Sequence, residues 1–344
     1  MNFNIVNSDV NILLIEPYFT GSHKQWAEGF AKHSRHDVRL LTMKGQFWKW
    51  RMHGGAVTLA REFNALNWRP DLILTTDMLD VTTFMALTQS KSHGIPIAIY
   101  FHENQISYPW SPNDRDIQKN RDSHYGFINY ASTLAADTIF FNSDFHMESY
   151  LGELPKFLRH FPDHRELDSV DIIREKSRIL HLGMDLQKFD IHKTSHKKDP
   201  LILWNHRWEY DKNPESFFSV LNKVQEQGFK FDLAVLGENF SQYPDIFIDA
   251  HKTFETEIVQ WGYTESFPDY AKWLWMADIL PVTSKQEFFG GSVMEAMYCD
   301  TWPILPKRLT YPELLPPNQH LQHLYLNEND LYEKLICIGK LWSC

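Results

Sequence analysis

Short apolar runs alternate with stretches of helical length along this chain, and the alternation occurs twice. Each run is bounded by turn-forming residues, so each is predicted to be a buried strand of a parallel sheet built from β-α-β units. The first series has runs at residues 10–15, 38–42, 72–76, 97–101, 138–142 and 179–182. The second has runs at residues 201–204, 231–236, 258–261 and 279–282, with a helix predicted over 214–227 between Pro214 and Gly228.

A polar, lysine-rich segment separates the two series. It covers residues 190–200 and ends in Pro200, which indicates a linker. The 344 residues are also about twice the usual length of one domain. We therefore expect an α/β protein of two Rossmann-like lobes, residues 1–192 and 193–344, facing a central cleft into which the carboxyl ends of the strands point. A short helix at residues 331–341 could pack back on the first lobe.

Several protein classes are excluded by what the chain lacks. No apolar run approaches the roughly 18 residues that a membrane span needs. No basic flank precedes the apolar run at 12–15, so no signal peptide is expected. Cys299, Cys337 and Cys344 form neither a CxxC pair nor a metal-ligand spacing, which argues against a disulfide scaffold and a cysteine zinc site. A cytoplasmic protein is expected.

The charge is acidic overall but locally basic. The net charge of −10 is a poor sign for nucleic-acid binding. Residues 23–61, however, hold only Glu28 and Asp37 as acids. The same segment contains eight cationic residues: Lys24, Lys32, Arg35, Arg39, Lys44, Lys49, Arg51 and Arg61. This segment is either an anion-binding face or an ordinary solvated surface.

The first candidate site follows the first strand of the second series. Arg207 offers a planar fork of donors, and Lys212 a compact charge, between that strand and the next helix. Together they could neutralise a diphosphate at a helix N-terminus. Glu209 and Asp211 lie between them, so a surface ion-pair cluster is the alternative.

A second candidate site is the glycine turn at residues 284–297. Gly290 and Gly291 let the backbone approach a ligand, and Glu287 and Glu295 flank the turn. Ser292 and Glu295 also have the spacing of a capping box, and the sequence alone favours that structural role for Glu295.

Two further segments follow strands of the first series. His102 comes directly after the strand at 97–101, where a structural hydrogen-bonding role is commoner than a catalytic one. The segment 16–24 has one glycine and does not match the dinucleotide fingerprint, which disfavours an NAD-binding protein. The metalloprotease, serine-hydrolase and P-loop motifs are also absent.

The combination is more specific than its parts. Arg207 and Lys212, followed by Glu287 and Glu295 around a glycine turn, resemble a retaining GT-B glycosyltransferase of the glycogen synthase-like superfamily. Residues 182–189 resemble that superfamily's Asn-Gly-Val-Asp segment. Further blocks are similar to the tRNA-queuosine α-mannosyltransferase family, and these lie at residues 21–25, 100–105, 161–165, 206–209, 211–212, 214–218 and 287–290.

The resemblance implies a reaction. The family transfers mannose from GDP-mannose to the cyclopentenediol of queuosine, at the wobble position of tRNA-Asp. The transfer retains configuration and uses no metal ion or other cofactor. By this resemblance Arg207 and Lys212 neutralise the diphosphate, and Glu287 holds sugar hydroxyls. Glu295 takes the ribose diol, and His102 lies near the reacting carbon.

The resemblance also implies the binding surfaces. The donor would contact Gly21, Ser22, Phe288, Phe289, Gly290 and Gly291, with the base near Trp261, Gly262 and Tyr263. The tRNA would contact Lys24, Trp48, Lys49, Trp50, Arg51, Asn104 and Gln105. The segment 46–53 could instead be an amphipathic core segment whose cations reach solvent. A glycosyltransferase with a glycan or metabolite acceptor, or a catalytically dead binding module, remains a rival function.

Overall fold

The computed structural model describes residues 9–109, 124–196, 199–238 and 243–342, so residues 197 and 198 of the predicted linker and Cys344 lie outside it. The chain divides into two compact units after Met184. The predicted boundary was at residue 192. The segment before it joins the second unit because Phe189 is fully buried there and packs edge-on against Phe267, with ring centroids 5.0 Å apart.

The first unit is built on a six-stranded sheet. Its strand order is β2-β1-β3-β4-β5-β6, and all pairs are parallel. The strands are β1 (Asn11–Phe19), β2 (Asp37–Lys44), β3 (Leu72–Thr76), β4 (Ile97–Phe101), β5 (Thr138–Phe141) and β6 (Ser177–Ile179). The helices are α1 (Gly21–His33), α2 (Trp48–Ala65), α3 (Val81–Ser92), α5 (His124–Ala135), α6 (Asp144–Arg159) and α7 (Ser169–Lys176).

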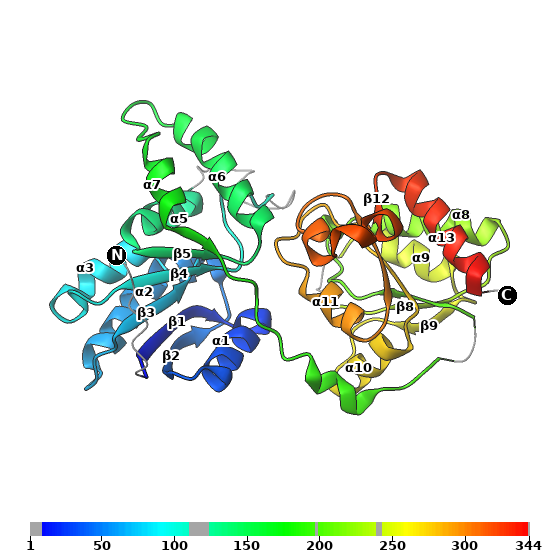
Figure 1. Cartoon of the computed structure of the whole chain (residues 1–344), viewed down its shortest axis with the longest axis horizontal. Coiled ribbons are helices and arrows are strands. Elements are labelled where there is room, and N and C mark those ends of the chain that lie inside the picture. Colours follow the sequence, from blue (N-terminus) through cyan, green and yellow to red (C-terminus); the bar gives the residue numbers. More distant parts are fainter. Residues whose placement is uncertain (1–8, 110–123, 197–198, 239–242, 343–344) are drawn as a thin grey trace. The chain divides into compact units, whose positions relative to one another are not determined.

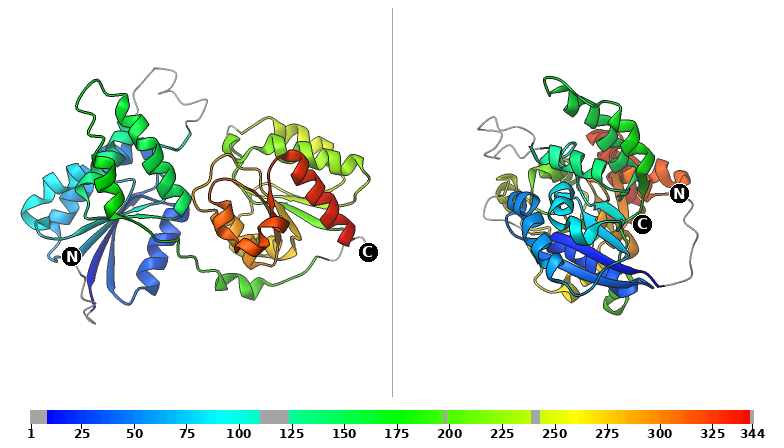
Figure 2. Two further views of the ribbon diagram at one scale, coloured as in Figure 1. Left: turned by 45° about the horizontal axis from the view of Figure 1, so that its top comes forward. Right: turned by 90° about the vertical axis from the view of Figure 1, so that its left-hand side faces the viewer.

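Helices cover both faces of this sheet, because successive strand residues point to opposite sides. Leu13 and Ile15 of β1 join a core cluster with α2, α3, α5, α6 and α7. Ile12 and Leu14 join a second cluster with Trp26 of α1. The left-hand view of Figure 2 shows α1, the first blue helix of the chain, on its own side of this sheet. The near-continuous apolar runs in the sequence follow from this double burial.

The second unit has the same plan. Its sheet has the order β12-β11-β10-β7-β8-β9. The strands are β7 (Leu201–Trp204), β8 (Asp232–Val235), β9 (Ile258–Trp261), β10 (Ile279–Pro281), β11 (Trp302–Pro306) and β12 (Leu324–Tyr325). The helices are η1 (Gln187–His192), η2 (Tyr210–Lys212), α8 (Pro214–Glu226), α9 (Ile246–Thr253), α10 (Phe267–Met276), α11 (Gly291–Tyr298), η3 (Tyr311–Leu314), η4 (Pro317–Gln319), α12 (His320–His323) and α13 (Glu328–Trp342).

Nine of the ten predicted strands coincide with strands of the structure, whereas the run at 179–182 meets β6 only at Ile179, and β11 and β12 were not predicted. Two prolines in β11 argue against a strand, and β12 has only two residues. The last helix, α13, lies beside α8 (Figure 1). Its apolar residues Leu331 and Leu335 are buried in the core of the second unit. No helix among the described residues is long and apolar enough to cross a membrane.

Candidate active site

The candidate site of the second unit forms because β7 and β10 are neighbours in the sheet. The segments after their carboxyl ends therefore meet. Thr283 Oγ1 donates to the carbonyl oxygens of Lys212 and Asn213, each at 3.0 Å, and the Lys285 N–H donates to the Asp211 carbonyl at 2.7 Å. Asn213 adopts a left-handed conformation, with φ 54°, which ends η2 directly before Pro214 opens α8.

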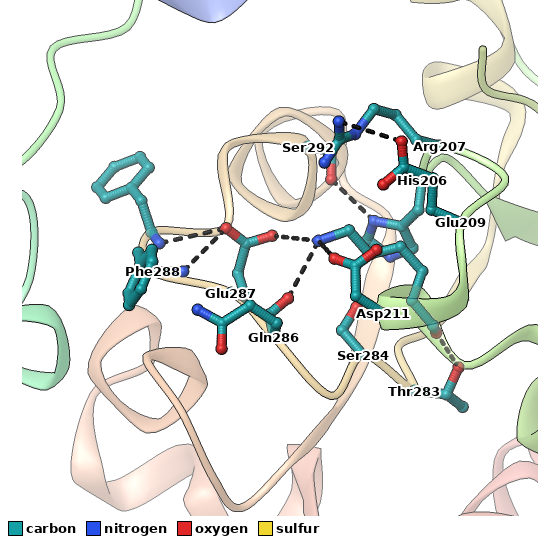
Figure 3. Close-up of polar contacts among 12 residues, drawn as sticks. His206, Arg207, Glu209, Asp211, Thr283, Ser284, Gln286, Glu287, Phe288 and Ser292 are labelled. Atoms are coloured by element: carbon teal, nitrogen blue, oxygen red, sulfur yellow. Dashed lines mark hydrogen bonds and ion pairs between the residues drawn. The ribbon is translucent and has the colours of Figure 1, made fainter. Parts of the chain in front are cut away.

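Lys212 lies at the centre of this site. Its side chain is 10% exposed. The Nζ atom lies 3.3 Å from Asp211 Oδ2, 3.3 Å from Glu287 Oε2 and 3.1 Å from the carbonyl oxygen of Gln286. In Figure 3 the labelled side chains of Asp211 and Glu287 and the segment at Gln286 surround the point where these contacts meet. The alternative of a surface ion-pair cluster therefore does not describe Lys212, which is buried.

Glu287 is held on both carboxylate oxygens. Oε1 accepts the N–H groups of Phe288 at 3.1 Å and Phe289 at 3.3 Å, whereas Oε2 faces Lys212. Burial alone would raise the pKa of Glu287, but Lys212 and the backbone N–H groups lower it to about 2. The pKa of Lys212 is raised despite its burial, because Glu287 and Asp211 favour its charged form. Both groups are therefore ionised at neutral pH.

Arg207 is the more exposed cation of the site. Its side chain is 47% exposed, and Nη1 lies 3.4 Å from Glu209 Oε1. Arg207 lies close enough to Lys212 for its positive charge to disfavour the charged form of Lys212, which lowers the pKa of that residue. The structure thus brings Arg207, Lys212 and Glu287 together, as the sequence predicted, and leaves the guanidinium nearest to solvent.

The capping-box interpretation of Ser292 and Glu295 is wrong. The helix α11 begins at Gly291, its N-cap is Gly290 with φ 88°, and no side chain caps it. Ser292 therefore lies inside the helix, where its Oγ is 3.2 Å from His206 Nδ1. Glu295 Oε2 accepts a hydrogen bond from the Tyr270 hydroxyl at 2.8 Å, and burial raises the pKa of Glu295.

Sequence reasoning missed three residues of this unit: His206, Tyr270 and Arg308. His206 is buried, and its Nε2 has no hydrogen-bond partner among the described residues. Burial and then Lys212 lower the pKa of His206 to about 3, so the ring is neutral. Arg308 donates to the carbonyl oxygens of Thr283 and Ser284 and so holds the turn beside Lys212. His206 belongs to the block at residues 206–209 that resembles the family, but no sequence pattern marks Tyr270 or Arg308.

The segment predicted to meet the nucleotide base is only partly accessible. Trp261 packs inside the second unit, with its ring centroid 5.4 Å from that of Trp208. Tyr263 is 59% exposed, and Gly262 has φ 99°. A base could therefore reach Tyr263 more readily than the ring of Trp261.

In the first unit, His102 lies at the carboxyl edge of the sheet with two residues that sequence reasoning missed. Glu16, near the end of β1, is fully buried and its Oε2 lies 3.0 Å from His23 Nδ1, in the first turns of α1. The ring centroids of His23 and His102 are 4.2 Å apart. Burial and then His23 hold the pKa of His102 well below its ordinary value. Glu16, His23 and His102 are also close enough together to hold a metal ion.

The predicted diphosphate loop opens α1. Gly21 has φ 50°, and no atom would lie within 4 Å of a Cβ there, so the space beside it is open. Ser22 follows in the same turn, which carries no acidic residue. Lys24 is half-exposed and pairs with Glu28 at 3.8 Å.

The predicted tRNA-binding residues differ in accessibility. Trp50 is 63% exposed, and Phe47, which was not predicted, is 77% exposed in a left-handed conformation. Trp48 instead packs on Tyr125, with centroids 5.2 Å apart and Lys49 Nζ 5.4 Å from the Trp48 ring. Arg51 Nε donates to the carbonyl oxygen of Lys44 at 3.0 Å.

Asn104 and Gln105 were also predicted to contact tRNA. Asn104 is fully buried, and its Oδ1 accepts the N–H groups of Ile106 and Ser107. Its side chain therefore shapes the turn and offers RNA no surface. Gln105 is half-buried and donates to Glu103 Oε1 at 3.1 Å.

Both parts of the chain match known protein families. A family model described as tRNA-queuosine alpha-mannosyltransferase N-terminal matches residues 11–184, and one described as glycosyl transferases group 1 matches residues 187–335. The tRNA-queuosine alpha-mannosyltransferase of Drosophila melanogaster is 32% identical over 338 residues, which cover 94% of this chain and 86% of that protein.

Solved structures show the same fold at low identity. Sucrose-phosphate synthase from Thermosynechococcus elongatus is 15% identical, with a TM-score of 0.64 over 95% of this chain and 89% of that one. A glycosyltransferase from Rickettsia africae is also 15% identical, with a TM-score of 0.64 over 97% of this chain and 89% of that one. The GT-B fold expected from the sequence is confirmed. The family-model matches and the Drosophila relative show that this chain is a glycosyltransferase belonging to the tRNA-queuosine α-mannosyltransferase family.

Proposed function

We propose that this enzyme transfers mannose from GDP-mannose to the cyclopentenediol of queuosine in tRNA-Asp, with retention of configuration. The observation that carries this proposal is the buried pair of Lys212 and Glu287, with Arg207 beside it. A cation next to a departing diphosphate stabilises the leaving group more than the intact donor, and so lowers the barrier. Lys212 and Arg207 would supply the charge that a metal ion supplies elsewhere, so no metal or other cofactor is part of the proposal.

Glu287 would orient the sugar. Because Lys212 and two backbone N–H groups fix both of its oxygens, the carboxylate is already ionised and needs little reorganisation when hydroxyl groups bind. Phe288 and Phe289 are among the residues that the resemblance assigned to the donor, but their backbone N–H groups donate to Glu287. Glu295 would exchange its bond to Tyr270 for the ribose diol.

The acceptor would bind to the basic segment of the first unit, residues 23–61. The two exposed rings of Phe47 and Trp50 offer flat apolar surface on which unstacked bases can lie. Lys49, Arg51 and Lys24 would meet phosphates, which reconciles an RNA substrate with the acidic net charge. A cytoplasmic location is part of this proposal, because tRNA is the substrate.

The test is an incubation of the purified protein with GDP-mannose and queuosine-containing tRNAs, with and without EDTA, followed by nucleoside mass spectrometry. We expect one hexose on queuosine in tRNA-Asp only, and no effect of EDTA. GDP release without hexose on RNA would place the acceptor in another chemical class. UDP- or ADP-linked sugars, used in parallel, identify the donor. A hexose on every queuosine tRNA would contradict the proposed specificity.

A further inference from the structure

The residues around His102 form a cluster that the proposed function leaves largely unused. Glu16 belongs to β1, His23 to α1, Asp77 follows β3 and His102 follows β4. Strands β1, β3 and β4 are consecutive neighbours in the sheet, so all these groups meet at one edge. Asp77 is 2% exposed, and its Oδ1 accepts the backbone N–H of His102 at 2.8 Å. Glu103 and His146 complete the titratable groups that act on this cluster.

Two buried atoms of this cluster have no partner. Asp77 Oδ2 and His102 Nε2 are both shielded from solvent, and neither has a hydrogen-bond partner among the described residues. A buried polar atom without a partner costs roughly 1–3 kcal/mol, so such atoms mark places where a ligand or a water completes the structure. Two of them at one sheet edge point to a ligand with more than one polar group.

Glu16 and His23 form an ion pair under this site. Glu16 accepts the Tyr18 N–H on Oε1 at 2.7 Å and faces His23 with Oε2 at 3.0 Å. Burial would lower the pKa of His23, but Glu16, with smaller effects of Asp77 and Glu103, raises it to about 9. Burial, with Glu103 and Glu16, raises the pKa of Asp77 to about 8. The cluster therefore combines a charged imidazole, a neutral imidazole and a protonated carboxyl group.

This combination selects one ligand chemistry. A phosphate is anionic and would face Glu16 and Glu103, and a metal ion would have to displace the proton of His23. A hydroxyl group is both donor and acceptor, so it can pair with His102 Nε2 in either tautomer and with either form of Asp77. We propose that His23 and Asp77, together with His102, bind a pair of hydroxyl groups of the substrate, and that Glu16 is the positioning residue that holds His23 in place. This inference rests on the proposed function for the source of the hydroxyls, which is the acceptor diol or the donor sugar.

The test uses the full-length protein with two matched pairs of variants. His23→Phe keeps an aromatic ring against His102 but removes its N–H groups, and its control is His33→Phe at the exposed end of the same helix. Asp77→Asn lies at the carboxyl end of β3, and its control is Asp71→Asn before the same strand. We expect kcat/KM to fall at least about tenfold for the first member of each pair and to stay unchanged for the controls.

The kinetic pattern identifies the source of the hydroxyls. If they belong to the acceptor, the variants raise the KM for tRNA but release GDP from GDP-mannose at the wild-type rate when tRNA is absent. If they belong to the donor sugar, GDP release falls as much as transfer. Glu16→Gln should move the alkaline limb of the pH–rate profile from near pH 9 toward lower pH, because His23 then loses its proton more easily. A merely structural Glu16 would lower activity without moving that limb.

A binding measurement separates this inference from the proposed function. Protein labelled with ¹⁵N-histidine is titrated with queuosine nucleoside and with GDP-mannose, and the ring-nitrogen shifts of His102 and His23 are followed by NMR. A shift with either compound supports the site even if the wild-type protein transfers no mannose. Well-folded variants with unchanged kinetics, no shift with either compound, or one tightly bound metal ion per wild-type chain would each overturn it.

Discussion

The ammonium of Lys212 lies 3.3 Å from Oε2 of Glu287, and both side chains are largely buried. Removing one partner of a buried ion pair leaves the other charge unpaired, which costs roughly 3–5 kcal/mol. We expect Lys212→Met to lower the free energy of unfolding by about that amount and to abolish transfer. The measurement is chemical denaturation together with the mass-spectrometric assay.

The double variant Lys212→Met, Glu287→Gln is the control for this prediction. It removes both charges of this pair, so part of the lost stability should return while the activity stays absent; the rest stays lost because Asp211, also 3.3 Å from Lys212 Nζ, has still lost its cation. A double variant as unstable as the single one would show that the aliphatic stem of Lys212, and not its charge, holds the two segments together.

Glu287→Gln alone should separate donor binding from turnover. The amide still fits the space and can bond to sugar hydroxyls, so the Kd for GDP-mannose should change only a few-fold. Turnover should fall at least about a hundredfold, because the fixed negative charge beside the sugar is lost. Isothermal titration and steady-state rates test this, and near-normal turnover would remove Glu287 from its proposed role.

The Glu287 carboxylate also makes stability depend on pH. Its pKa in the folded protein is about 2, below the ordinary 4.5, so the unfolded chain takes up this proton first as the pH falls. The stabilisation is therefore complete above pH 4.5 and is lost as the pH falls toward 2. The difference in unfolding free energy between the wild type and Glu287→Gln should shrink over that range. A constant difference would contradict the depressed pKa.

The exposed rings of the basic segment should contribute to RNA binding and not to folding. Trp50→Ala should leave the Tm unchanged and weaken tRNA binding about five- to a hundredfold, the usual effect of losing one stacked base. Trp48→Ala is the matched control, because Trp48 packs on Tyr125 and its loss should lower the Tm. Filter binding at fixed salt concentration measures the first effect.

The charges of this segment are tested separately. Lys49→Glu with Arg51→Glu should weaken tRNA binding, make it less dependent on salt, and leave GDP-mannose binding intact. Equal loss of both substrates would indicate misfolding.

The sheets and the cations of the donor site could be predicted from the sequence, because apolar runs and charges at strand ends are local signals. Arg207, Lys212 and Glu287 all follow strands and meet where two strands are neighbours. Long-range partners gave no local signal. The bonds from Arg308 to Thr283 and from Tyr270 to Glu295 join segments that no spacing rule connects.

Predictions also differed from the structure where the same residue type can either bind a ligand or stabilise the local backbone. Ser292 and Glu295 have capping-box spacing, but the N-cap of the helix is the left-handed Gly290, two positions before Ser292. Asn104 follows a strand, as ligand-binding residues do, yet its side chain closes its own turn. The Glu16–His23 pair was missed because the two residues come together only at the bend from β1 into α1.

The distribution of the cores has a consequence for how the protein unfolds. Each core cluster among the described residues draws its members from one unit, and α13 completes the second unit rather than the first. Each unit therefore has a core of its own and can unfold as a cooperative block with its own Tm. In calorimetry, GDP should raise the Tm of the second unit, which contains Lys212. A core substitution such as Phe63→Ala should lower the Tm of the first unit.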